Sequence, residues 1–353
     1  MRQGNRLTPR TQTWNKETKA LQYFFIWKSL PLPPIFSTMT NPYEADPEKI
    51  PITDMYADVP FYGRYYPKPD DFCVDLQHVN SQATDSLRYW ASVVRLCTED
   101  IRIYPADEGG RDVFALGSVI VKSSHLHARE GSQCTEIDFS YADANEIQAI
   151  ALAKTVLKDV KVPEIYFSGK VLTLATRLSL QWLTSTQING RQVLVQERLP
   201  GVGLCVAWPY LSKVQRDSYK EQARKILLQL HSIKPTEKLQ ARSHVVLDPN
   251  ILTNGRINPL EGEILFSDTN QDPDMSFMHN DLTESNCIVN KETIVGLIDW
   301  EMAGFFGWKT AGEVHRRIRT PQREHFVNAN LREEQLQDMM FWKDLYDKDV
   351  PNN

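Results

Sequence analysis

The sequence predicts an α+β fold, in which a β-rich half with one helix is followed by a mainly helical half. Short apolar runs bounded by glycine or polar residues lie between residues 101 and 197, as is typical of strands. A helical period interrupts these runs near Asp143, and a longer one follows Ser212. The 353 residues, 41% of them hydrophobic, are enough for about two domains with a real core.

The first 38 residues differ from the rest of the chain in charge. They carry a net charge of +5, whereas residues 39–353 carry −10. We expect residues 1–38 to be a disordered extension or the result of a start codon placed too early, because Met39 opens a stretch that reads like an ordinary N-terminus. A mitochondrial targeting peptide is the alternative, although the segment lacks a clean amphipathic helix.

Charge, apolar runs and cysteines limit the classes of function. An acidic folded part argues against nucleic acid as a partner and is compatible with a cationic ligand or with ordinary solubility. No apolar run approaches the roughly 20 residues of a membrane-spanning helix. The five cysteines are odd in number and show no C-x-x-C spacing, which argues against zinc and disulfide scaffolds. We expect a soluble cytoplasmic protein without a membrane partner, and the sequence leaves its oligomeric state open.

Residues 39–100 are expected to lead into the β-rich half. Residues 42–72 are rich in Pro, Tyr and Asp without a sustained period, which indicates an extended segment wrapped over a domain. A helix is predicted within residues 81–97 from apolar residues at helical spacing. These residues are Leu87, Trp90, Val94 and Cys97.

The next part of the chain predicts one antiparallel sheet with a helix packed on it. The expected strands are residues 101–104, 113–116, 118–122, 164–169 and 192–197. The helix begins near Asp143 and places Glu146 at the edge of a buried apolar stripe.

Residues 171–187 interrupt what would otherwise be a hairpin. Deleting them joins the strands at 164–169 and 192–197 through Asn189–Gly190, which is a strong hairpin signal. We hypothesise a retained intron, because a Val codon begins with GT and a Gln codon can end in AG. A genuine loop or an extra helix is the alternative. In both cases the segment is expected to lie outside the hydrogen-bonded sheet.

The helical half follows a short connector at Leu199–Gly201. Its best-defined helix includes residues 218–233, where apolar side chains recur on one face. Ser212 is the expected N-cap of a slightly longer helix.

The stretch "FMHNDLTESNCIV", residues 277–289, contains several polar groups between two apolar runs. The β-rich runs "CIVN" and "TIVGLID" are separated only by "KE", so they predict a hairpin that sets Asn286 opposite Leu297 or Ile298. Asn286 and Asp299 would then meet at one end of the hairpin. An amide oxygen and a carboxylate at that separation suit Mg²⁺.

Asp281 lies on the loop that enters this hairpin. It can face the same metal without ligating it, which is where a base that receives a hydroxyl proton belongs. His279 is a candidate for the same catalytic loop. We assign it a bracing role, because a histidine beside a buried strand is more often a packed, hydrogen-bonded residue than a catalyst.

These motifs resemble the aminoglycoside-phosphotransferase and choline-kinase-like family of the protein-kinase-like fold, in particular its fungal members with "IDWE-x-AGF". The residues that carry the resemblance are "HNDLTESN" (279–286) and "GLIDWEMAGF" (296–305), and it covers roughly residues 85–310. It implies two lobes that close over ATP, a β-rich N-lobe at 101–198 and a mainly helical C-lobe at 199–353.

The resemblance also implies roles for residues of the N-lobe. Lys122, at the end of "SVIVK", would touch the phosphates of ATP, and Glu146 would be its ion-pair partner. Gln196, Glu197 and Arg198 would form the hinge and offer backbone groups to adenine. The alternatives are a solvated lysine at a strand end and, for Glu146, the N3 residue of a capping box with Asp143.

The sequence departs from the kinase pattern in several places. No G-x-G-x-x-G precedes Lys122, Asn280 stands where protein kinases have Arg, and Trp300–Glu301 follows Asp299 in place of Phe–Gly. A-P-E is absent, and 54 residues follow Asp299, too few for an activation segment and a full peptide-binding lobe. A protein substrate is therefore disfavoured.

We expect an ATP- and Mg²⁺-dependent phosphotransferase that acts on a hydroxyl group of a small molecule, with an amine-bearing acceptor as one option. Glu284 and Glu301 could meet a cationic acceptor or be merely solvated. The alternative is a catalytically inactive nucleotide-binding pseudokinase or scaffold protein. A metal-dependent hydrolase that uses His279 and Asp281 is a third hypothesis, but a second histidine at ligand spacing is missing.

Overall fold

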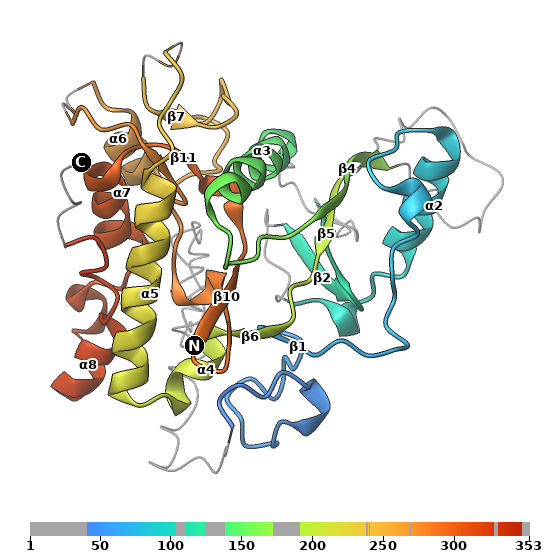
Figure 1. Cartoon of the computed structure of the whole chain (residues 1–353), viewed down its shortest axis with the longest axis horizontal. Helices are drawn as coiled ribbons and strands as arrows, with labels where there is room; N and C mark the ends of the chain where they lie inside the picture. Colours follow the sequence, from blue (N-terminus) through green and yellow to red (C-terminus); the bar gives the residue numbers. More distant parts are fainter. Residues whose placement is uncertain are drawn as a thin grey trace, which may run out of the picture.

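The computed structural model describes residues 41–103, 111–123, 138–171, 191–237, 239, 241–268, 270, 272–327 and 331–347. Figure 1 shows a smaller β-rich part beside a larger, mainly helical part. The predicted α+β class is confirmed. The expected extension at residues 1–38 lies outside the described residues.

Four antiparallel strands form the sheet of the β-rich part. They are β2 (Asp112–Leu116), β3 (Val119–Ser123), β4 (Ile165–Val171) and β5 (Arg191–Glu197), in the order β2-β3-β5-β4. Along β3, Val119 and Val121 are buried in the core on one face, so alternation turns Lys122 to the other face. The strands predicted within 113–122, 164–169 and 192–197 are confirmed.

The strand predicted at residues 101–104 is not formed at 101–103, and residue 104 lies outside the described residues. Glu99–Ile101 form a single 3₁₀ turn, and Arg102 N–H donates to the Glu99 carbonyl at 3.2 Å. Arg102 forms a bridge to Phe114 of β2 and lies 3.5 Å from Oδ1 of Asp112, and the Ile103 N–H donates to the Val113 carbonyl at 2.8 Å.

Two helices flank the sheet (Figure 1), and their apolar faces belong to different cores. α2 (Thr84–Arg95) covers one face, where Trp90 stacks on Phe167 with 5.1 Å between ring centroids. α3 (Ser140–Val156) lies between the sheet and the helical part. Its apolar stripe is buried in the larger core, with the helical part. The helix contacts the sheet as expected, through Glu146 and Lys122, while α2 covers the other face of the sheet.

The strands on either side of the predicted insertion pair directly with each other. Val171 ends β4, is fully buried and pairs with Arg191 of β5. Val171 therefore belongs to the sheet and not to an insertion. Residues 172–187 and the Asn189–Gly190 turn lie outside the described residues.

The helical part is built around α5 (Lys213–His231). Ser212 caps it as predicted, and Gln215 completes a capping box. The remaining α-helices of the described residues are α4 (Leu204–Ala207), α6 (Pro259–Phe266), α7 (Trp308–Val314) and α8 (Glu333–Met339). A π-helical turn, His315–Arg319, continues α7. Trp342 and Leu345, which follow α8, are buried in the same core as α5.

Short strands join the N-terminal segment to the helical part. β1 (Arg64–Tyr65), β6 (Gly201–Gly203), β9 (Cys287–Asn290) and β10 (Thr293–Leu297) form one sheet in this order. β7 (Ser243–His244), β11 (Gly304–Phe305) and β8 (Phe277–Met278) form another. β8 and β9 thereby hold both ends of the loop at residues 279–286.

The predicted hairpin is formed by β9 and β10. Its two turn residues, Lys291 and Glu292, have φ values of 44° and 68°, and positive φ at both positions matches the twist of paired strands. The Ile298 N–H donates to the Asn286 carbonyl at 3.1 Å. The predicted register is confirmed, and Asn286 lies one residue from the level of Asp299.

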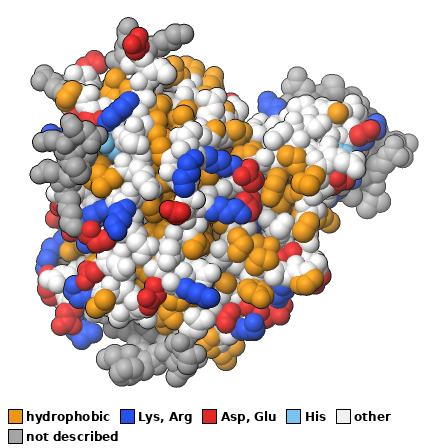
Figure 2. Space-filling model, in the orientation of Figure 1, with side chains coloured by type: hydrophobic (Ala, Val, Ile, Leu, Met, Phe, Trp, Pro, Cys, Tyr) orange, Lys and Arg blue, Asp and Glu red, His pale blue; other side chains and the backbone are white. Residues whose placement is uncertain are grey.

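No helix among the described residues is both long and apolar enough to cross a membrane. On the face shown in Figure 2, basic and acidic side chains are interspersed with hydrophobic ones over both parts of the molecule.

Candidate active site

A buried ion pair links β3 to α3. Lys122 Nζ lies 2.8 and 2.7 Å from the two carboxylate oxygens of Glu146, and the predicted pair is therefore present. Both side chains are buried. Because α3 begins at Ser140, Glu146 lies in its second turn and does not take part in a capping box. Neither alternative interpretation, a solvated Lys122 or a capping Glu146, agrees with this geometry.

Lys122 also contacts the helical part. Its Nζ lies 3.0 Å from Oδ1 of Asp299. Burial lowers the pKa of Lys122, but the carboxylates of Asp299, Glu146 and Glu301 outweigh it and hold the pKa above its ordinary value. Burial is also the main influence on Glu146, and it raises the pKa of this carboxyl against the opposing effect of Lys122. The ammonium group is thus the shared counter-ion of two parts of the molecule.

Asp299 directly follows the hairpin in a left-handed backbone conformation, with φ of 64°. A positive φ is uncommon for an aspartate and marks a sharp change of chain direction. Trp300, which follows it, is fully buried, and its Nε1–H donates to the Leu297 carbonyl at 3.2 Å. The buried indole anchors the backbone, so Asp299 remains at the end of the hairpin beside Lys122.

The loop that contains Asp281 is held by its own polar groups. Asn286 Nδ2 donates to the main-chain oxygen of Asp281 at 2.7 Å and to its Oδ2 at 3.2 Å. The amide oxygen is then the atom of Asn286 that a metal could use. His279 is fully buried, lies 4.4 Å from the Trp300 ring, and has hydrogen bonds at both ring nitrogens, to Ile298 and to Asp281.

Burial lowers the pKa of His279 to about 4, so the ring is neutral at pH 7. The hydrogen bond to the Ile298 carbonyl requires Nε2–H to be the donor, and Nδ1 accepts from the Asp281 N–H. Both nitrogens are therefore in use within the loop. This arrangement fits a bracing role and disfavours the hydrolase hypothesis, in which His279 would bind a metal.

Arg111 forms a second cluster that sequence reasoning missed. It is bound to Asp143 and lies 3.4 Å from Oε2 of Glu301, while Gln192 donates to the other oxygen of Asp143 at 2.9 Å. Asn145 donates to the main-chain oxygens of Glu301 and Ala303, both at 2.9 Å. The sequence did contain a signal for this cluster, because Asp143 precedes Glu146 by three residues and therefore lies on the same face of the helix.

Arg319 forms a third cluster, and it too was missed. Its Nε lies 2.8 Å from Oδ1 of Asp281, and its Nη2 is bound to Glu261 of α6. Sequence spacing offered no signal here, because Arg319 and Glu261 are far from Asp281 along the chain. In each of the three clusters one cation lies between two carboxylates, so each carries a net charge of −1.

The carboxylates between the lobes could bind a cation. Glu146, Asp299 and Glu301 each offer an oxygen, and these oxygens lie within 4.8 Å of one another. Carboxylate oxygens are the ligands that Mg²⁺ prefers, together with water and phosphate. The donor set therefore fits Mg²⁺, with Asn286 as an additional oxygen donor. Glu301 was expected only as a group that meets an acceptor or solvent.

The expected hinge uses its backbone donors within the protein. The Glu197 N–H donates to the Glu164 carbonyl at 2.8 Å, and the Arg198 N–H donates to the Ser118 carbonyl at 2.9 Å. The Arg198 guanidinium donates to the main-chain oxygen of Arg64 at 2.8 Å. In this conformation the amide groups of Glu197 and Arg198 are not available to adenine. Gln196 continues strand pairing on both sides within β5.

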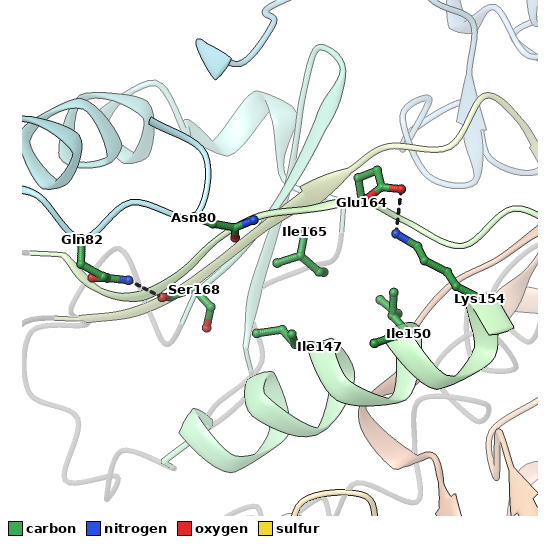
Figure 3. A pocket seen from close by; sticks show the side chains of 9 residues that line it. Asn80, Gln82, Ile147, Ile150, Lys154, Glu164, Ile165 and Ser168 are labelled. Carbon is green, nitrogen blue, oxygen red and sulfur yellow. Dashed lines mark hydrogen bonds and ion pairs between the residues drawn. The ribbon is translucent and has the colours of Figure 1, made fainter. Parts of the chain in front are cut away.

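Two further features lie apart from these clusters. Glu284 is partly buried, and burial raises its pKa to about 7, with Asp338 and Lys220 as its charged neighbours. A pocket of about 390 Å³ lies on the other side of α3, between Ile147, Ile150 and β4 (Figure 3). The ion pair between Lys154 and Glu164 closes one end of it.

Comparison with known proteins points to one enzyme family. Residues 144–305 match the model of the phosphotransferase enzyme family. The matched segment contains Glu146, Asp281, Asn286 and Asp299, whereas Lys122 precedes it. Over this segment, which is less than half of the chain, the sequence is similar to that family. A search of curated proteins finds no significant match.

Several solved structures are similar at low sequence identity. The ternary complex of APH(2")-IIa with streptomycin and ATP is 13% identical, with 77% of this chain and 93% of that chain covered and a TM-score of 0.36. The ADP-bound aminoglycoside phosphotransferase APH(2'')-Ib is 12% identical, with 75% and 99% covered and a TM-score of 0.35. The apoenzyme of macrolide 2'-phosphotransferase MphH from Brachybacterium faecium is 13% identical, with 72% and 90% covered and a TM-score of 0.32.

Proposed function

We propose that the protein transfers the γ-phosphoryl group of ATP, in the presence of Mg²⁺, to a hydroxyl group of a small molecule. The observation that carries this proposal is the position of Lys122, which is bound to Glu146 of α3 and to Asp299 beside the loop of Asp281 and Asn286. The phosphotransferase family match over residues 144–305 supports it.

Each group has a role in this reaction. Lys122, held by Glu146, would bind phosphate oxygens, and Asp299 and Asn286 would hold Mg²⁺, which neutralises charge on the phosphates when bound. The Asp281 carboxylate would orient the acceptor hydroxyl. As the hydroxyl oxygen forms a bond to the γ-phosphorus, the bond from this phosphorus to the β-γ bridging oxygen breaks. The hydroxyl proton passes to Asp281.

Positioning supplies most of the rate in such a reaction, because its loose transition state requires little base strength. The fixed loop at residues 279–286 agrees with this requirement. The net negative charge of the three clusters would favour an amine-bearing acceptor over an anionic one. A library of amino- and hydroxy-compounds, screened by thermal shift with Mg·ATP present, tests this preference.

The alternative is a protein that binds nucleotide without phosphoryl transfer. One observation favours it, since the carboxylate of Asp281 already has Arg319 and Asn286 as partners. A carboxylate oxygen has two lone pairs, however, so each can accept a further hydrogen bond from a hydroxyl group. Turnover of Mg·ATP by the purified full chain separates the two functions.

Two substitutions test the division of roles. Asp281→Asn is expected to leave Mg·ATP affinity nearly unchanged and to lower kcat by about two orders of magnitude or more. Asp299→Asn is expected to weaken nucleotide binding and Mg²⁺ dependence together, because it removes a negative charge beside the triphosphate. Calorimetry with Mg·ATP and phosphate transfer to the acceptor found in the screen measure both. Full activity of Asp281→Asn would exclude the mechanism.

A further inference from the structure

Arg319 is the cation nearest to the loop of Asp281 among the described contacts, and it comes from the far end of the chain. It ends the π-helical turn that follows α7, where the Thr320 N–H donates to the His315 carbonyl at 3.0 Å. Such turns often occur at functional sites, because they add a residue to the helix and change where the following side chain lies. The residue before Asp281 is Asn280, so the loop does not supply this positive charge itself.

The guanidinium group contacts both the backbone and the side chain of the loop. Its Nε donates to the Asn280 carbonyl oxygen at 3.1 Å and lies 2.8 Å from Oδ1 of Asp281. Its Nη2 is bound to Glu261, and Asn280 Nδ2 donates to the same carboxylate at 3.2 Å. One planar fork thus joins the π-helical turn to the loop and to α6 through two nitrogens held in fixed geometry, which the single nitrogen of a lysine does not provide.

The charged groups of this arrangement are largely buried. Glu261 is nearly fully buried and the Arg319 side chain is 14% exposed. Burial lowers the pKa of Arg319, but Glu261 and Asp281 outweigh it and raise the pKa above its ordinary value, so the group stays charged. Asn280 has a φ of 60°, an unusual conformation that its contacts with Arg319 and Glu261 support.

We infer that Arg319 is a positioning residue, which fixes the Asp281 carboxylate for phosphoryl transfer by holding one of its oxygens while Asn286 holds the other. This inference rests on the proposed function. Because Oδ1 of Asp281 contacts Arg319 and Oδ2 contacts Asn286, the plane of the Asp281 carboxylate is fixed from two sides. A reaction that depends on positioning then loses rate when Arg319 is removed, whereas nucleotide binding, which uses Lys122 and Asp299, does not.

The test compares Arg319→Met with a matched control on the same turn. Arg316 also pairs with two carboxylates, Glu313 at 3.2 Å and Asp347 at 3.1 Å, and neither belongs to the catalytic loop. Arg316→Met therefore removes the same side chain without touching Asp281. The readouts are Mg·ATP affinity by calorimetry, release of inorganic phosphate from Mg·ATP with water as acceptor, and the midpoint of thermal unfolding, all with the full chain.

Arg319→Met is expected to lower kcat by about 10- to 100-fold while Mg·ATP affinity changes by less than about twofold. Arg319→Lys keeps the charge but not the planar guanidinium group, so its kcat should lie between that of the wild type and that of Arg319→Met. Arg316→Met should retain the wild-type kcat. If Arg319→Met keeps the turnover of Arg316→Met, or loses affinity and turnover in proportion, the positioning role is overturned.

Two further outcomes separate the inference from the proposed function. If Arg319→Met does not fold, Arg319→Lys decides: full turnover overturns the role, and reduced kcat at unchanged affinity supports it. If the wild-type chain binds Mg·ATP but neither releases phosphate nor phosphorylates an acceptor, the proposed function fails and the role of Arg319 falls with it. Loss of turnover in Arg319→Met alone cannot be confused with that result.

Discussion

The charged groups between the lobes and two polar side chains inside the helical lobe are held by different means. In the β-rich lobe, the partners of Lys122 and Arg111 are carboxylates, and each cation contacts one carboxylate on α3 and one on the helical lobe. In the helical lobe, Arg319 likewise has carboxylate partners, but the partly buried Asp274 and the buried His315 are tied to the backbone. Asp274 accepts from the Trp308 N–H at 2.8 Å, and His315 donates to the Trp342 carbonyl at 2.8 Å.

This difference separates groups that a ligand can rearrange from groups that support the fold. A side-chain carboxylate that loses its cation can turn toward a metal or a phosphate-bound ion, whereas a backbone partner cannot leave its place. We therefore expect substitutions between the lobes to affect stability and nucleotide binding together. Substitutions at the backbone-bound groups should affect stability alone.

The largest effect is expected for Lys122→Met. It leaves the fully buried carboxylate of Glu146 without its nearest cation, and breaking a buried pair in this way costs about 3–5 kcal/mol of unfolding free energy. The double variant with Glu146→Leu should recover most of this loss, because it removes the uncompensated charge. Urea unfolding at pH 7 measures the unfolding free energy of the two single variants and of the double variant. A double variant as unstable as the sum of the single ones would contradict the explanation.

Substitutions at two separate glycines test the role of close backbone contacts in the helical lobe. Gly307 has φ of 78° and ψ of 165°, and an added Cβ would lie 2.1 Å from the Asp274 carbonyl oxygen. Gly307→Ala should therefore cost about 3 kcal/mol. Gly255 has a similar φ of 72° but open space around it, so Gly255→Ala should cost only about 1 kcal/mol. Equal losses in urea unfolding would show that the contact with Asp274 is unimportant.

Asp274→Asn should have a smaller effect that depends on pH. Burial raises the pKa of this carboxyl, but N–H donors from Trp308 and Ser276 outweigh it and lower the pKa from 3.8 to about 2. The contribution is therefore complete above pH 4 and is lost as the pH falls toward 2. At pH 7 we expect a loss of about 1–2 kcal/mol after allowance for solvent screening. Unfolding curves of wild type and variant should converge progressively as the pH falls from about 4 to about 2.

The smallest effect at pH 7 is expected for His315→Gln, which keeps a donor for the Trp342 carbonyl but cannot titrate. Burial lowers the pKa of His315 from 6.5 to about 4. The unfolded chain thus binds the proton first, and wild-type stability falls as the pH drops from 6.5 to 4, by at most about 1.4 kcal/mol per pH unit from this residue. The variant should show a shallower decline in urea unfolding. An unchanged slope would assign the effect to other groups.

Local patterns in the sequence predicted the α+β class, the Ser212 cap, the hairpin that brings Asn286 beside Asp299, and, through the family resemblance, the pairing of Lys122 with Glu146. Strand alternation, capping and two-residue turns depend on neighbours in the chain, so these features can be read from short segments. The roles of Asp281, Asn286 and Asp299 stay predictions until the substitutions are made.

The tertiary structure decided which partners the buried faces and charges meet. The apolar stripe of α3 predicted burial, but only the position of α2 on the sheet assigned that stripe to the larger core. Arg111 and Arg319 reach carboxylates on distant segments, and the expected hinge amides are used by Glu164 and Ser118. Periodicity shows that one face of a helix or strand is buried. It does not show which residues cover that face, because the covering groups come from elements far away in the chain.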